Sequence, residues 1–120
     1  MYSAAVLDHF ENPRNVGELA DATALVEVSN PACGDVMQLS VRVESARISA
    51  VAFRTRGCVT AIACGSVLTE MLVGKTIEQA RAILPATIAE ALGGLPPATV
   101  HGSLLACDAL NEVLSKINQS

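Results

Sequence analysis

The chain has 120 residues, of which 51% are hydrophobic and 17% are charged, and its formal net charge at pH 7 is −4. This length suits one domain, spanning residues 1–120, with a substantial buried core, and the composition argues against disorder. The acidic balance and the scarcity of aromatic residues argue against a nucleic-acid platform. No apolar run reaches the roughly 18 to 20 residues of a membrane span. Because the N-terminus lacks the pattern of a signal peptide, a cytoplasmic protein is expected.

The N-terminal segment begins with a short helical spacing of apolar residues. The pattern covers Tyr2 to Phe10, and Asn12-Pro13 ends it because the residue before a proline is disfavoured in a helix. The segment is expected to be a mobile arm over the domain or a frayed terminus.

Three strands are predicted next, over residues 24–29, 36–43 and 48–55. Apolar and β-branched residues alternate in each of them, and a turn at Ser45-Ala46 separates the second from the third. Short connections between successive strands favour an antiparallel sheet with one covered face.

Helices follow the strands. An amphipathic helix is predicted over residues 58–73, a capping box formed by Thr76 and Gln79 begins a second, residues 87–92 form a short third, and residues 103–117 form a long closing helix. Strands followed by helices predict an α+β fold in which the helices pack on one face of the sheet.

The four cysteines are dispersed rather than paired in a CxxC motif. They are Cys33, Cys58, Cys64 and Cys107. In a reducing compartment, dispersed cysteines do not indicate disulfides. Any site that they form must be assembled by folding, which leaves thiol chemistry and a composite metal site open.

One short loop places a thiol and a carboxylate two residues apart, just before the second predicted strand. Its sequence is Pro31-Ala32-Cys33-Gly34-Asp35, in which the proline and the glycine permit a sharp turn. Sulfur and oxygen donors together suit a borderline metal such as zinc or iron. Taken alone, however, a polar turn that happens to contain a cysteine is the commoner explanation.

Two further donors occur at similar junctions. Cys58 follows Gly57 between a predicted strand and a helix, where the positive end of the helix dipole stabilises a thiolate. His101 precedes the closing helix. Alone, Cys58 would more often be a buried apolar residue and His101 an exposed loop histidine. Together with Cys33 and Asp35, they predict a composite metal or thiol site.

Several motifs follow one another in a distinctive order and spacing. They are residues 6–17 (VLDHFENPRNVG), 30–37 (NPACGDVM), 57–63 (GCVTAIA), 95–97 (LPP) with His101, and 105–110 (LACDAL). In these motifs the chain resembles the IscU/NifU N-terminal family of iron–sulfur cluster assembly scaffolds over nearly its whole length.

The resemblance implies a scaffold or carrier rather than an enzyme. Such proteins accept sulfur from a cysteine desulfurase, take up iron, build a transient [2Fe–2S] cluster and pass it to apo acceptor proteins. An iron donor or a ferredoxin is a further partner. The resemblance also implies that Cys33 and Cys58 are thiolate ligands, that His101 is an imidazole ligand, and that Asp35 is a ligand or keeps the cluster labile. Before a cluster forms, the same groups are expected to bind Zn²⁺, in a monomer or a homodimer.

The chain departs from the family pattern at two positions. Where the family has a third cysteine directly after the histidine, this chain has Gly102. The nearest thiol, Cys107, lies about 7.5 Å and roughly 140° further along a helix, and both Cys107 and Cys64 are expected to be buried. In the stretch that a DnaK-type chaperone grips, Thr99 replaces a lysine, and the missing cation predicts weakened recognition.

Two other functions remain open. A zinc-dependent sulfur-transfer protein, like the related SufU proteins, would relay persulfide sulfur through a zinc-bound thiolate. Those relatives usually carry an insertion and a third cysteine that this chain lacks. A metal-free interaction paralogue would keep only the fold, but the joint presence of Cys33, Asp35, Cys58 and His101 argues against it.

Overall fold

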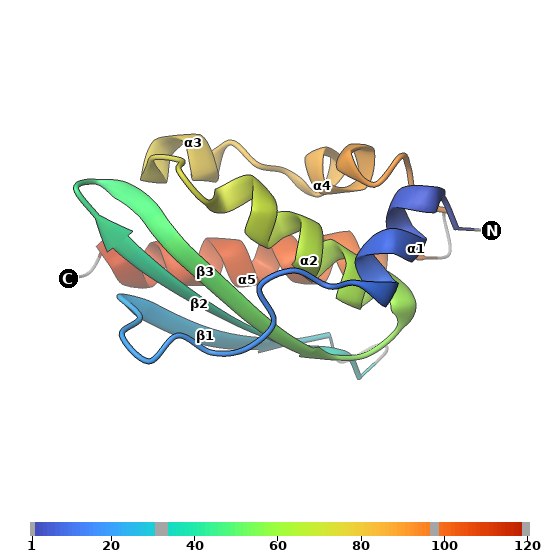
Figure 1. Ribbon diagram of the computed structural model, residues 1–120, viewed down its shortest axis with the longest axis horizontal. Coiled ribbons are helices and arrows are strands. Elements are labelled where there is room, and N and C mark those ends of the chain that lie inside the picture. Colours follow the sequence, from blue (N-terminus) through green and yellow to red (C-terminus); the bar gives the residue numbers. More distant parts are fainter. Residues whose placement is uncertain (1, 31–33, 97–98, 119–120) are drawn as a thin grey trace.

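The computed structural model describes residues 2–30, 34–96 and 99–118. One helix precedes a three-stranded sheet, and the remaining helices follow it (Figure 1). In chain order the elements are α1 (Ala4–Glu11), β1 (Ala24–Ser29), β2 (Val36–Glu44), β3 (Arg47–Arg56), α2 (Val59–Leu72), α3 (Ile77–Arg81), α4 (Pro85–Ala91) and α5 (His101–Asn118). The predicted α+β class, the three strands and the long closing helix are confirmed.

The sheet is an antiparallel meander in the order β1-β2-β3. Val36 at the start of β2 pairs with Arg56 at the end of β3, so the loop before β2 and the connection from β3 to α2 meet at one end of the sheet. The opposite end is the predicted tight turn, in which Ser45 and Ala46 both have positive φ angles, 53° and 64°. The sheet therefore has a site end and a hairpin end.

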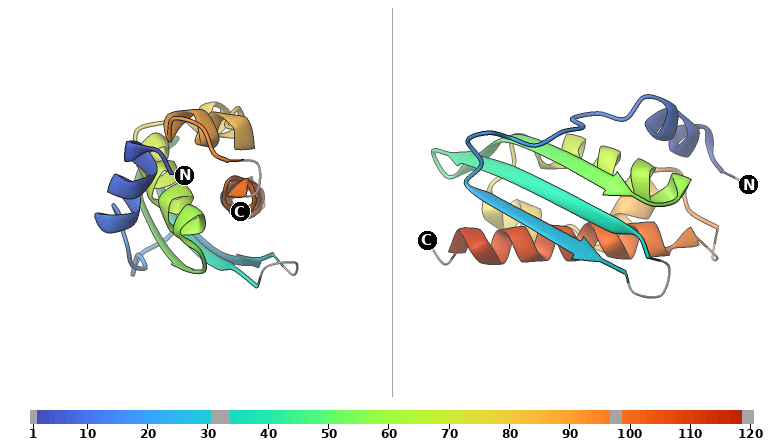
Figure 2. Two further views of the ribbon diagram at one scale, coloured as in Figure 1. Left: turned by 90° about the vertical axis from the view of Figure 1, so that its right-hand side faces the viewer. Right: turned by 90° about the horizontal axis from the view of Figure 1, so that it is seen from below.

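Helices α2 and α5 cover one face of the sheet, and α3 and α4 lie over these two helices (Figures 1 and 2). The start of α3 also reaches the sheet, because its N-cap residue Thr76 forms an antiparallel bridge with Arg47 of β3. The covered face is apolar because alternate residues of a strand point to the same side. Met37, Leu39 and Val41 of β2 are fully buried in this way. Packing is tight in the middle of α2, where a Cβ added at Gly65 would lie 2.6 Å from the ring of Phe53.

Helix α2 is buried on nearly all sides, whereas the sequence predicts an amphipathic helix. Every residue from 63 to 69 is buried, including the polar Ser66 and Thr69. The reason is that α1 covers the side that would otherwise face solvent. Nδ1 of His9 lies 2.7 Å from the hydroxyl of Ser66, and the side-chain amide of Asn15 donates to the hydroxyl of Thr69 at 3.0 Å, so these two buried side chains have partners in the N-terminal segment.

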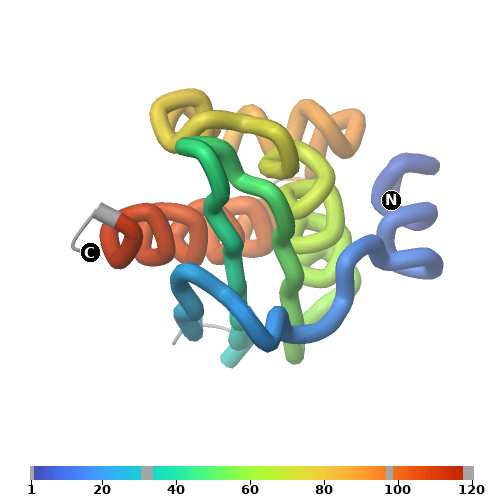
Figure 3. Tube along the Cα trace, turned by 60° about the vertical axis from the view of Figure 1, so that its left-hand side comes forward, coloured from blue at the N-terminus to red at the C-terminus, as the bar shows by residue number. Residues whose placement is uncertain are grey.

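The N-terminal segment, expected from the sequence as a mobile arm or a frayed end, is folded and docked. Val6 is fully buried, and the hydroxyl of Ser3 donates to the carbonyl of Leu92, just after α4. After α1 the chain runs beside β3, where Val16 forms a parallel bridge with Phe53 (Figure 3). Within the described ranges, no helix is both long and apolar enough to cross a membrane.

Candidate functional site

Cys58 lies at the start of α2, two residues after the end of β3. It is the N-cap residue, with an extended backbone (φ −76°, ψ 170°), yet its side chain takes no hydrogen bond from the helix. The thiol is exposed. A sulfur that is exposed and uncommitted to the helix in this way is available to a metal or to another sulfur atom.

Asp35 lies directly before β2 and contacts Cys58. Its side chain is buried, with the residue 7% exposed, and the thiol of Cys58 donates to Oδ2 of Asp35 at 3.4 Å. The approach requires a glycine at position 57, because a Cβ on Gly57 would lie only 2.5 Å from Cγ of Asp35. The pair offers soft sulfur and hard oxygen to one ion, a donor mixture that zinc and iron both accept.

Cys33 lies outside the described residues. The residues on either side of the undescribed stretch are joined by backbone hydrogen bonds. Gly34 donates to the carbonyl of Asn30 at 2.8 Å, and Asn30 donates to the carbonyl of Asp35 at 2.9 Å. These bonds fix the backbone of Asp35 at the entrance to β2.

His101 is the first residue of α5 and is exposed. The next residue, Gly102, lies against the backbone of Thr60 in the first turn of α2, so the starts of the two helices are side by side. Over residues 2–30, 34–96 and 99–118, however, no three His, Cys, Asp or Glu side chains could hold one metal ion together. The structure thus pairs Asp35 with Cys58 and brings the helix of His101 to the same end, without joining the imidazole to them.

The other two thiols lie in the core, as predicted. Cys64 is 0% exposed and Cys107 is 5% exposed. Burial, with a smaller contribution from Cys58, raises the pKa of the Cys64 thiol to about 12. Burial and the nearby Asp108 raise the pKa of the Cys107 thiol. Both thiols therefore stay protonated near neutral pH and are separate from the Cys58–Asp35 pair.

A polar cluster between α1 and α2 was not singled out from the sequence. His9 bridges two residues of α2, with Nδ1 on Ser66 and Nε2 3.4 Å from a carboxylate oxygen of Glu70. Arg14 donates its backbone N–H to Ser66 at 2.9 Å and pairs with Asp8 at 2.7 Å. Burial, helped by the charge of Arg14, lowers the pKa of His9. The only signal in the sequence was that His9 and Arg14 belong to the first motif of the resemblance.

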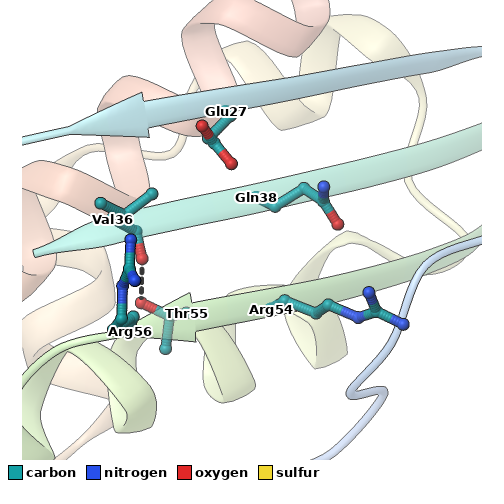
Figure 4. A pocket seen from close by; sticks show the side chains of 6 residues that line it. All are labelled: Glu27, Val36, Gln38, Arg54, Thr55 and Arg56. Atoms are coloured by element: carbon teal, nitrogen blue, oxygen red, sulfur yellow. Dashed lines mark hydrogen bonds between the residues drawn. The ribbon is translucent and has the colours of Figure 1, made fainter.

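A shallow pocket of about 300 Å³ lies on the open face of the sheet, near its site end (Figure 4). Side chains from all three strands line it: Glu27, Val36, Gln38, Arg54, Thr55 and Arg56. Glu27, Gln38 and Arg54 are cross-strand neighbours, so they form one polar row. Among the described residues that line it there is no thiol or imidazole, so this part of the chain forms a polar surface beside the site. The alternation of polar residues in β2 and β3 was the signal for it.

Comparison with known proteins identifies the family to which the chain belongs. The family model described as "NifU-like N terminal domain" matches residues 1–119. The iron-sulfur cluster assembly scaffold protein IscU 1 of Archaeoglobus fulgidus is 51% identical over 114 residues, which cover 95% of this chain and 74% of that protein. The corresponding IscU protein of Haemophilus influenzae is 48% identical over 118 residues, covering 95% of this chain and 93% of that protein.

The fold also matches a crystal structure. An N-terminal NifU-like protein from Brucella abortus has a TM-score of 0.82 with this chain at 19% identity, covering 98% of this chain and 94% of that one. At this identity the match concerns the fold alone, whereas the family model and the more similar relatives concern the sequence itself. By its sequence and its fold, the chain belongs to the family of NifU-like N-terminal domains.

Proposed function

We propose that the chain is a scaffold, not an enzyme, on which an iron–sulfur cluster is assembled and from which it is passed on. The Cys58–Asp35 pair carries the proposal: an exposed thiol at a helix start lies 3.4 Å from a buried carboxylate. The names of the two relatives from Archaeoglobus fulgidus and Haemophilus influenzae, which are iron-sulfur cluster assembly scaffold proteins, support it.

Four side chains hold the cargo in this proposal. Cys33 and Cys58 supply thiolates, His101 an imidazole and Asp35 a carboxylate. A mixed set of sulfur, nitrogen and oxygen donors binds iron less firmly than four thiolates, and an exposed site lets an acceptor protein approach. A [2Fe–2S] cluster held in this way can leave the scaffold. In the cluster-free protein the same donors suit Zn²⁺.

Cys58 accepts sulfur in this proposal, from a cysteine desulfurase. Its thiolate attacks the outer sulfur of the donor's persulfide, a new S–S bond forms at Cys58, and the donor cysteine leaves as a thiolate. Asp35 is the nearest described acceptor for the proton of the Cys58 thiol. Conversion of each transferred sulfur to sulfide takes two electrons, which a donor of the ferredoxin type supplies. Cys64 and Cys107 take no part, because burial keeps them protonated and out of reach.

Release of the cluster is proposed not to depend strongly on a DnaK-type chaperone. Position 99, where the family has a lysine, is a threonine whose hydroxyl donates to the carbonyl of Pro96 at 2.8 Å. The side chain is thus folded back onto its own loop and offers no positive charge to a partner. Cluster transfer to acceptor proteins is the step in which this difference should appear.

The test is anaerobic reconstitution with iron, cysteine and a cysteine desulfurase, followed by visible absorption. Wild type should form a cluster, Cys33→Ser and Cys58→Ser should not, and Cys107→Ser should form it as wild type does. A cluster that depends on Cys107 would contradict the ligand set. Absence of a cluster, with one zinc ion retained per chain, would instead favour a zinc-dependent sulfur-transfer protein.

A further inference from the structure

The starts of α2 and α5 touch through their backbones. An ideal Cβ built on Gly102 would lie 2.9 Å from both the carbonyl carbon and the oxygen of Thr60, and 3.0 Å from the nitrogen of Ala61. All three neighbours are backbone atoms, so no change of rotamer can relieve such a contact. Any side chain at position 102 must push one helix away from the other.

The surroundings of this contact are closed. Thr60 is 0% exposed and Ser103 is 3% exposed, so solvent is excluded on both sides of Gly102. In the part of the chain that the structure describes, the buried hydroxyl of Thr60 has no hydrogen-bond partner. An unpaired buried hydroxyl in a native structure is uncommon, and here it belongs to the residue whose backbone meets Gly102.

The contact also determines the relative positions of two candidate ligands, His101 and Cys58. His101 directly precedes Gly102, and Cys58 lies two residues before Thr60. The position of one helix start on the other therefore sets the position of the imidazole relative to the thiol. A shift of even 1 Å in such a scaffold moves a ligand out of coordination distance.

We propose that Gly102 is a positioning residue, which holds His101 at the Cys58 end of α2 by allowing the two backbones to touch. Its role toward the metal rests on the proposed function, whereas the packing does not. Position 102 is then not a vacant place for a third thiol. The space that a side chain at position 102 would need is filled by the backbone of α2.

Thermal unfolding tests the contact. In an ordinary helix, replacing glycine by alanine stabilises the protein. Here Gly102→Ala and Gly102→Cys should both lower the melting temperature, by about 5 °C or more. The matched control is Gly65→Ala, where the added Cβ meets the Phe53 side chain in the core, away from Cys58. A Gly102→Ala variant at least as stable as wild type would overturn the proposal.

Binding of Co²⁺ to the metal-free protein, followed under reducing conditions by thiolate-to-cobalt absorption, tests the positioning. Gly102→Ala should bind Co²⁺ about 10- to 100-fold more weakly than wild type, the usual effect of losing a residue that orients ligands. Gly65→Ala should bind as wild type does, although it is also less stable. Equal losses in the two variants would overturn the positioning role, because general destabilisation would then explain both.

The cysteine variant separates the proposal from its main competitor. If position 102 were an open ligand site, Gly102→Cys would bind Co²⁺ more tightly than wild type and would show stronger thiolate-to-cobalt absorption. That result would overturn the proposal, whereas weaker binding without added absorption is expected. Failure of the wild-type chain to bind Co²⁺ or a cluster would refute the proposed function and, with it, the positioning role. The melting temperatures would still test the backbone contact between Gly102 and Thr60.

Discussion

The start and the middle of α2 give the same side chain opposite properties. At the start, Cys58 is exposed and lies 3.4 Å from a carboxylate oxygen. In the middle, Cys64 is fully buried, and burial raises the pKa of its thiol to about 12. Since residue type and helix are shared, the difference comes from what packs around each thiol. The sheet, α1 and α5 enclose the middle of the helix. The reactivity of each cysteine therefore depends on the tertiary packing around it.

The largest expected effect is on thiol reactivity. In a Cys33→Ser background, a thiol reagent should modify Cys58 at least about a thousandfold faster than Cys64 or Cys107, because buried thiols react only when the structure opens. Quenched labelling followed by mass spectrometry measures the three rates. Similar labelling rates for Cys58 and Cys64 would contradict the difference in accessibility between the start and the middle of α2.

The free energy of unfolding should respond in the opposite order, with a larger loss for substitution of the buried Cys64 than of the exposed Cys58. Cys64→Ser should lower the free energy of unfolding by about 1–3 kcal/mol, because a hydroxyl in an apolar core has no partner there. Cys58→Ser should leave this free energy unchanged or raise it by up to about 1 kcal/mol, because serine can accept the N-cap hydrogen bond that Cys58 does not take. Urea unfolding measures both values. Cys64→Ser should still support cluster reconstitution, and its failure to do so would bring Cys64 into the site.

A smaller effect, on Co²⁺ binding, is expected when the Cys58–Asp35 contact is changed. Gly57→Ala should displace the Asp35 carboxylate and weaken Co²⁺ binding about tenfold, and Asp35→Asn should have a similar effect. If both act through the same carboxylate, the double variant should bind no more weakly than either single one. Losses that add in a Co²⁺ titration would show that Gly57 and Asp35 act separately.

The smallest expected effect is a pH dependence of the free energy of unfolding, which arises from His9 in the polar cluster between α1 and α2. Burial lowers the pKa of His9 below its ordinary value of 6.5, so the unfolded chain takes up a proton more readily than the folded one. Stability from this residue is therefore complete above about pH 6.5 and is lost as the pH falls through the lowered value, with a slope of at most about 1.4 kcal/mol per pH unit.

Urea unfolding between pH 7.5 and 5 would measure this loss, and His9→Gln is the control. The residues facing His9 are Ser66 and Glu70 of α2, with Asp8 and Arg14 beside it. An unchanged pH dependence in His9→Gln would assign the effect to these carboxylates instead.

Local patterns predicted most of the fold and the positions of Cys58 and His101 at the starts of two helices. Alternation and capping placed the strands and helices, and helical spacing correctly separated Cys64 and Cys107 from the candidate ligands. The all-round burial of α2 could not be predicted, because its cause is α1, a segment whose docking is tertiary. The sequence presented Gly102 as a missing thiol, since a backbone contact between two chain-distant helix starts leaves no local pattern. The expectation for Cys33 lies outside the described residues and stays a prediction.

The turn at the hairpin end of the sheet is strained, and relieving this strain would stabilise the protein without changing the site. Ser45 and Ala46 both adopt positive φ, and neither is one of the residues that tolerate it easily. Left-handed backbone costs an ordinary residue roughly 1 kcal/mol. Ser45→Asn with Ala46→Gly would remove that strain at the end of the strands opposite Asp35 and Gly57. Such a background would keep weakened site variants folded, so that loss of ligand binding could be separated from loss of structure.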